Sequence, residues 1–253
     1  MIPREHGAWA MLLAPFAAAV ILARQWGWEL IPALVAVVGV FVLREPLVVW
    51  LRGRPSEAAR GRRFLLGYAL PTAAAGLVLL WRLPPAPLVT IGAAAAGLMA
   101  LSTWLILHNR QRSLLLQLAS AAGLNGAGVV AWLAAGHDLD PRVFWLWALL
   151  FAHSAAAVLV VHARLEARKA QPPEMWRQAA LAQAALAAGA AALLAAGRWP
   201  LAVPLAVSAS VHAWDLRALR RGQSVRMPLR RVGFRALALS LVVSALTLAA
   251  LWR

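Results

Sequence analysis

The chain of 253 residues is 62% hydrophobic and only 13% charged, so it has more apolar surface than one soluble core of this size can bury. It contains no cysteine, which excludes disulfides, thiol nucleophiles and thiolate metal sites. The formal net charge of +16 does not indicate a nucleic-acid partner, because the basic residues separate apolar runs of membrane-spanning length. We therefore expect a multi-pass inner-membrane protein that is surrounded by membrane lipids.

Apolar runs bounded by charged residues predict nine transmembrane helices, and hence an all-α bundle that forms a single membrane domain over residues 1–253. In chain order the runs cover residues 8–23, 30–43, 64–80, 88–107, 113–135, 144–161, 178–196, 200–214 and 236–252. The first, second and eighth runs are short for a hydrocarbon core that needs about 20 residues. They are either extended by interfacial tryptophans or partly re-entrant.

The basic residues between the runs predict how the bundle is oriented, since cytoplasmic segments hold the excess of Lys and Arg. With nine spans, the segments on the side of the N-terminus contain all but five of the 25 Lys and Arg. The five exceptions are Arg24, Arg82, Arg142, Arg198 and Arg253. This asymmetry predicts a cytoplasmic N-terminus and a C-terminus outside.

Histidines, carboxylates and arginines recur where the spans meet the cytoplasmic side. They are Arg4, Glu5 and His6 before the first span, Arg44 and Glu45 after the second, His108, Asn109, Arg110 and Arg112 after the fourth, His162, Arg164, Glu166 and Arg168 after the sixth, and His212 and Asp215 at the end of the eighth. One interpretation is a set of interfacial ion pairs that fasten helix ends together. The other is a pocket for an anionic headgroup or diphosphate, because Arg binds phosphate oxygens with paired donors.

Three polar residues inside the predicted spans are the most informative. Gln117 and Asn125 are eight positions apart, so they lie on one helix face and serve either as interhelical hydrogen-bonding groups or as ligand contacts. His153 is the only ionisable residue near the centre of a span, which makes it a candidate for the site as well as for a satisfied buried histidine. A haem or metal site that uses the histidines is a further alternative, although no two of them have ligand spacing on one helix.

The residues at positions 3–16, PREHGAWAMLLAPF, resemble the start of the YwiC-like family. Its members are bacterial integral membrane proteins of unassigned function. The Arg-rich segments 162–169 and 228–235 are also similar, so the resemblance is expected to extend over the whole chain.

A second similarity is to the intramembrane prenyltransferases of the UbiA type. It is carried by Arg110, Gln111, Arg112, Gln117 and Gly123 at the start of the fifth span, and by Arg4, Gly7 and Pro15. It implies a UbiA-like arrangement of nine helices around an inward-opening cavity for an isoprenoid diphosphate. The two aspartate-rich, magnesium-binding motifs of that family are missing, and Glu45 and Glu166 stand in their places as the candidate catalytic groups.

Three functions follow from these observations. The first is binding of an isoprenoid or other anionic lipid, with prenyl transfer as a further step and with magnesium as a candidate cofactor. The second is a non-enzymatic accessory or assembly factor of a membrane respiratory complex, whose protein partner the sequence does not name. The third is a small transporter, which the odd number of spans and the lack of matched broken helices disfavour.

Overall fold

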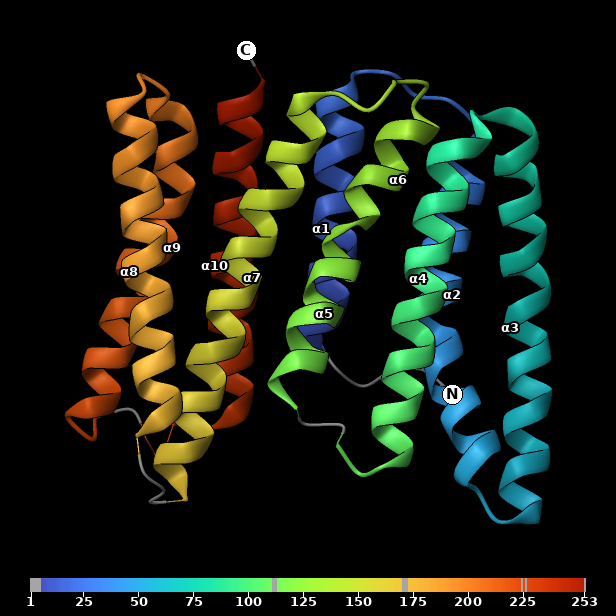
Figure 1. Ribbon diagram of the computed structural model, residues 1–253, viewed down its shortest axis with the longest axis horizontal. Coiled ribbons are helices and arrows are strands. Elements are labelled where there is room, and N and C mark those ends of the chain that lie inside the picture. The colour runs from blue at the N-terminus through green and yellow to red at the C-terminus, as the bar shows by residue number, and fades with distance from the viewer. Residues whose placement is uncertain (1–5, 111–112, 170–172, 224, 226, 253) are drawn as a thin grey trace.

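The computed structural model describes residues 6–110, 113–169, 173–223, 225 and 227–252, without the side chains of residues 6, 229 and 230. Over these residues the chain forms ten α-helices and no strand (Figure 1). The helices are α1 (His6–Ala23), α2 (Leu30–Arg52), α3 (Pro55–Arg82), α4 (Pro85–Leu107), α5 (Leu114–Asn125), α6 (Ala127–Ala134), α7 (Pro141–Arg168), α8 (Glu174–Ala195), α9 (Trp199–Arg220) and α10 (Leu229–Leu251).

Seven of the nine predicted spans are long and apolar enough, by length and composition, to cross a membrane. One of them is the pair α5 and α6, which together form the segment Leu114–Ala134 with a break at Gly126. The described part of α1, Gly7–Ala23, is shorter, and the polar C-terminal half of α9 keeps that helix outside the group of seven. The all-helical, multi-pass membrane architecture predicted from the sequence is therefore confirmed, whereas full crossing by α1 and α9 stays a prediction.

Two of the runs that look too short belong to longer helices. The second run ends at residue 43, but α2 continues through Arg44, Glu45 and Pro46 to Arg52. The eighth run ends at residue 214, but α9 continues to Arg220. Charged residues mark the edge of an apolar segment, and long basic side chains can reach water from there without ending the helix.

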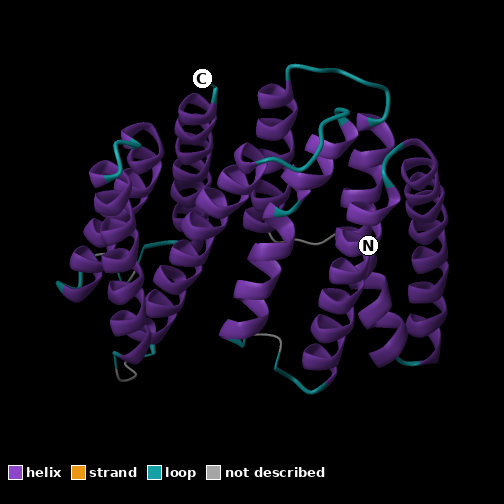
Figure 2. Ribbon diagram, turned by 45° about the horizontal axis from the view of Figure 1, so that its top comes forward, coloured by secondary structure: helices purple, strands orange, loops and turns teal. Residues whose placement is uncertain are grey.

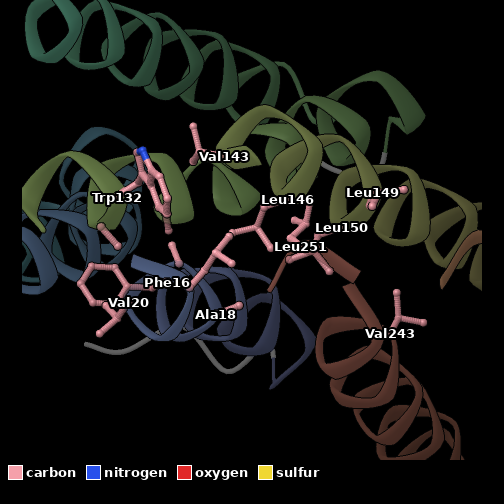
Figure 3. Close-up of a cluster of buried hydrophobic side chains, with 14 of the residues drawn as sticks. Phe16, Ala18, Val20, Trp132, Val143, Leu146, Leu149, Leu150, Val243 and Leu251 are labelled. Carbon is pink, nitrogen blue, oxygen red and sulfur yellow. The ribbon is translucent and has the colours of Figure 1, made fainter. Parts of the chain in front are cut away.

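The largest apolar core forms where α1, α6, α7 and α10 meet (Figure 3). Trp132 of α6 and Val143 of α7 are fully buried there, and Val243 of α10 is nearly so. The helices α1 and α6 approach each other closely at Gly128. A Cβ added to this glycine would lie only 3.0 Å from the carbonyl oxygen of Pro15. A small residue at this position lets the two backbones touch, as is typical of helix contacts in membranes.

The helices α2, α3 and α4 form a flank on the other side of the bundle from α8 and α9 (Figures 1 and 2). In this flank α3 packs mainly along α2. A Cβ on Gly61 of α3 would lie 2.7 Å from the backbone nitrogen of Trp50, whereas a Cβ on Gly67 would meet nothing within 4 Å. Gly61 therefore sets the distance between the two helices at the end where they are joined.

The helices α2, α4, α7 and α9 finish at one end of the bundle, where α3, α5, α8 and α10 begin (Figure 1). We call this the basic end, since it carries Arg52, Arg60, Arg168, Arg217 and Arg235 among others. The basic side chains that the structure describes at the opposite end are Arg24, Arg82, Arg142 and Arg198. The segments that the sequence groups on one side of the membrane thus share one end of the bundle.

Candidate functional site between α7, α9 and α10

A small cavity lies near the basic end, between α7, α9 and α10. Its volume is about 40 Å³. Four polar side chains line it, namely Arg164, His212, Asp215 and Arg235. The rest of the lining is apolar, so these four groups face one another in a setting that screens charge weakly.

The spacing along each helix explains why these side chains meet. On α7, His153, Ala157, Val160 and Arg164 follow one another at intervals of three or four residues, which places them on one face. On α9 the same spacing relates Ser208, His212 and Asp215, and on α10 it relates Ala236 to Leu239 and Ser240. The alanines at 157 and 236 leave room between the helices.

The charged groups of the cavity carry an excess of positive charge. Arg235 Nη2 lies 2.8 Å from Asp215 Oδ1, and the Arg235 side chain is half-exposed at the rim. Arg164 is only 3% exposed. Two guanidinium groups therefore accompany one carboxylate, and a buried charge of this kind needs a counter-charge or hydrogen-bond acceptors close by.

A buried histidine pair extends from the cavity toward the middle of the bundle. The rings of His153 and His212 stack with their centroids 5.4 Å apart, and they are 2% and 4% exposed. His153 Nδ1 lies 2.9 Å from Ser208 Oγ, and His153 Nε2 lies 3.1 Å from Ser240 Oγ. Because a hydroxyl can either donate or accept, both tautomers of His153 are satisfied.

His212 differs from His153 in its hydrogen bonding. Both of its ring nitrogens are buried, and neither has a hydrogen-bond partner among the residues that the structure describes. Its ring face packs on His153 and its side chain lines the cavity. An imidazole that is buried in this way is poised to hydrogen bond with a group that enters the cavity.

Other predicted site residues hold the ends of helices. Glu166 accepts hydrogen bonds from the backbone nitrogens of Met175, at 2.9 Å from Oε2, and Trp176, at 3.3 Å, and it thereby caps the first turn of α8. Arg168 donates to the carbonyl oxygens of Val225 and Met227 in the segment that joins α9 to α10. Both residues support the helices around the cavity and are engaged with backbone groups.

The polar residues of α5 join that helix to α7. Gln117 Oε1 lies 2.8 Å from His162 Nε2. Asn125 Nδ2 donates to Ser154 Oγ at 3.1 Å and to the carbonyl oxygen of Ala121 at 2.8 Å. These contacts match the interpretation of Gln117 and Asn125 as interhelical hydrogen-bonding groups.

The predicted site residues of α2 and α4 lie in the flank and do not line the cavity. Arg44 and Glu45 are half-buried on α2. Asn109 accepts a hydrogen bond from Arg52, and His108 Nδ1 contacts the carbonyl oxygen of Trp104 at 2.8 Å. The cavity lining likewise does not include Arg110. Arg4, Glu5 and Arg112, and the side chain of His6, lie outside the described residues.

Sequence reasoning missed Ser208, Ser240 and Arg235 as parts of this site. The first could have been found from its position four residues before His212, on the same face of α9. The other two lie on α10, and no pattern in the sequence indicates that α10 packs beside α7 and α9. Their place became visible only from the helix packing.

A metal ion has few ligands here. Among the residues that the structure describes, no group of three or more His, Asp or Glu side chains is placed to hold one. Asp215 is the one carboxylate of the cavity lining, and it is paired with Arg235. Magnesium binds several oxygen ligands, so these residues do not fit the magnesium site that the second similarity suggests.

Residues 2–132 match the family model described as YwiC-like protein. The chain belongs to the YwiC-like family. It is 26% identical over 156 residues to the uncharacterized protein YwiC of Bacillus subtilis strain 168, and the alignment covers 61% of this chain and 61% of that protein. No solved structure matches the chain.

The region matched by the YwiC-like model ends within α6, at the fully buried Trp132. It includes the whole flank together with Gln117 and Asn125, whereas their partners on α7 and the cavity between α7, α9 and α10 lie beyond it. Membership of the family therefore rests on the first half of the chain. The UbiA-like arrangement stays a prediction.

Proposed function

We propose that this YwiC-like protein resides in the bacterial inner membrane, with its basic end in the cytoplasm, and binds an anionic lipid by its headgroup in the cavity between α7, α9 and α10. Isoprenoid diphosphates are one class of such lipids. The observation that carries the proposal is the excess of guanidinium groups in a small, mainly apolar cavity near that end.

The chemistry of the lining supports this proposal. Guanidinium groups bind phosphate oxygens with paired donors, and such charge-assisted hydrogen bonds are about twice as strong as neutral ones. The apolar residues of α7 and α10 beside them suit a hydrocarbon chain. The positive-inside rule supports the orientation, because the basic end holds most of the Arg side chains.

Prenyl transfer would need a group that assists departure of a diphosphate. Glu45 and Glu166, the sequence-based candidates, lie on the flank and at the cap of α8 respectively. Arg164 and Arg235 could stabilise the negative charge of a departing phosphate group electrostatically. Lipid binding is thus the part of the proposal that the geometry supports best, and transfer would be a further property of the same cavity.

The test uses the purified full chain in a neutral detergent, with farnesyl diphosphate and phosphatidylglycerol as anionic probes and farnesol as the neutral probe. An anionic probe at a hundred times its Kd should stabilise the fold by about 2.7 kcal/mol, measured as a rise in Tm. The Arg164→Gln variant should lose most of this rise. Arg217→Gln removes the same charge from the exposed surface of α9 and should retain it.

Two results would contradict the proposal. One is that no anionic probe raises Tm above the farnesol baseline. The other is that Arg164→Gln and Arg217→Gln weaken binding equally, since that would mean a diffuse charge effect. Specific co-purification with a respiratory complex and no lipid effect would favour an accessory role.

The orientation is checked in cells by maleimide labelling of the variants Gln223→Cys and Arg198→Cys. The two positions lie at opposite ends of the bundle, and the chain has no other cysteine.

A further inference from the structure

We propose that the cavity selects a lipid that ends in a single phosphate group, a phosphomonoester, and that it binds this group without a divalent metal ion. His212 donates a hydrogen bond to one phosphate oxygen, and Arg164 and Arg235 bind the others. This inference rests on the proposed function and narrows its ligand class.

The size of the cavity favours one phosphate group. Its volume of about 40 Å³ corresponds to roughly three water-sized groups. A phosphomonoester presents three terminal oxygens as hydrogen-bond acceptors. Their number is about equal to the number of water-sized groups that the cavity holds. A diphosphate with a metal ion and its bound waters would have to extend past the rim of the cavity at Arg235.

The charges agree with the same ligand. A phosphomonoester carries about −1.5 to −2 charges at neutral pH. Asp215 is held by Arg235 at 2.8 Å, and Arg164 and Arg235 together exceed its single negative charge. The two guanidinium groups and one carboxylate of the lining carry a net charge of about +1, which a phosphate dianion would offset.

His212 gives an independent reason to expect a hydrogen-bonding ligand. It is 4% exposed, and its two ring nitrogens have no hydrogen-bond partner within the described part of the chain. A buried polar group without a partner is destabilising, and a phosphate oxygen in the cavity would relieve that cost. His153 stacks on the ring at 5.4 Å and is itself fixed by Ser208 and Ser240, so the imidazole of His212 is held in place before the ligand enters.

The donors of the cavity are sufficient without a metal. Magnesium prefers oxygen ligands in octahedral geometry, often carboxylates, and the one carboxylate of the lining is already paired. Arg and His supply N–H donors in its place. Phosphate binding by this site should therefore be unaffected by EDTA.

The apolar part of the lining distinguishes a lipid phosphate from free phosphate. Alkyl side chains of all three helices and of the segment before α10 surround the polar groups, namely Val160, Val161, Val211, Met227, Val232 and Leu239. A hydrocarbon chain that extends from the bound phosphate past these residues adds to affinity in proportion to the apolar area removed from water. Inorganic phosphate lacks that contribution.

The experiment measures Kd for the purified full chain by calorimetric titration, with farnesyl phosphate, farnesyl diphosphate, farnesol and inorganic phosphate as probes, each in EDTA and in magnesium. Farnesyl phosphate should bind at least about tenfold more tightly than each of the others in EDTA, which corresponds to one good charge-assisted hydrogen bond. Magnesium should leave its Kd unchanged.

The variants separate the role of His212 from general packing. His212→Phe keeps a ring that can stack on His153 and should weaken farnesyl phosphate binding by about tenfold to a hundredfold. Arg235→Gln, at a half-exposed rim position, provides a second variant that tests the site if His212→Phe fails to fold. His108→Phe, an exposed histidine of the flank, is the matched control and should bind as the parent does.

The outcomes distinguish this inference from the function on which it rests. Tighter binding of the diphosphate, a requirement for magnesium, or full binding by both His212→Phe and Arg235→Gln overturns the inference and leaves anionic lipid binding in place. Equal affinity for inorganic phosphate overturns the lipid selectivity. Absence of binding by every anionic probe, including phosphatidylglycerol, overturns the proposed function as well.

Discussion

The flank of α2, α3 and α4 and the helices α7, α9 and α10 contain the same kinds of residues at the basic end but bury them differently. In the flank, Asn109 and Arg52 bond to each other at an exposed helix end. Between α7, α9 and α10, Arg164 and His212 are almost completely buried. The comparison teaches that the packing of α7 against α9 and α10, and not the presence of Arg and His in the sequence, creates a buried polar cavity.

The packing of the two regions differs in a corresponding way. The flank is held by a close backbone contact at Gly61, whereas the other region is joined by hydrogen bonds from the buried His153 to Ser208 and Ser240. Without a strong hydrophobic effect between helices in lipid, close packing and interhelical hydrogen bonds are the two available sources of stability. Close backbone packing is the example in the flank, and interhelical hydrogen bonding is the example between α7, α9 and α10.

The largest effect is expected from a side chain placed in the backbone contact of the flank. Gly61→Leu should destabilise the fold by about 1–3 kcal/mol, because its Cβ would lie 2.7 Å from the backbone nitrogen of Trp50. The matched control is Gly67→Leu on the same helix, which has open space and should cost less than about 0.5 kcal/mol. Thermal unfolding in detergent measures both, and equal losses would break the contrast between the two regions.

A smaller effect is expected at the cap of α8. Glu166→Ala should cost about 1 kcal/mol, because the backbone N–H groups of Met175 and Trp176 lose their acceptor. Glu174→Ala removes an exposed carboxylate from the same turn and should cost at most about 0.5 kcal/mol. Hydrogen exchange at the start of α8 reports the difference. A loss of lipid binding by Glu166→Ala with no change in exchange would instead point to a direct contact between Glu166 and the ligand.

The smallest effect concerns a single interhelical hydrogen bond. A double-mutant cycle with His153→Leu and Ser240→Ala should give a coupling energy of about 0.6 kcal/mol, the average for such bonds within membranes. The bond between His153 Nε2 and Ser240 Oγ is the interaction that the cycle isolates. Additive losses in Tm would show that α7 and α10 are held by apolar packing alone, and the two regions would then be alike.

Much of the helical architecture could be predicted from apolar runs, because a chain in lipid must satisfy its backbone hydrogen bonds within helices. The apolar runs could not predict which helices pack against one another. Gly61 and Gly67 look alike in the sequence, yet only Gly61 touches another backbone. The break at Gly126 was missed as well, since α5 and α6 form one continuous apolar run.

The candidate site could be predicted only in part, because helix periodicity does not show which helices pack together. Arg164 and Arg168 are one helical turn apart, but Arg164 faces His212 and Asp215 whereas Arg168 reaches the carbonyl oxygens before α10. Periodicity along α7 groups His153 with Arg164, and it leaves open which helices complete the face. The contribution of Arg235 and Ser240 depends on tertiary packing that a single sequence does not encode in any local pattern.

The contacts of α1 have a consequence for how the protein is made. This helix packs against α5, α6, α7 and α10, and Arg24 at its end donates to the carbonyl oxygen of Trp252, 228 positions later. During synthesis α1 is therefore complete long before several of its neighbours exist. Until α10 emerges from the ribosome, one side of α1 lacks the neighbour that covers it in the folded chain, and final assembly waits for the C-terminal helix to arrive.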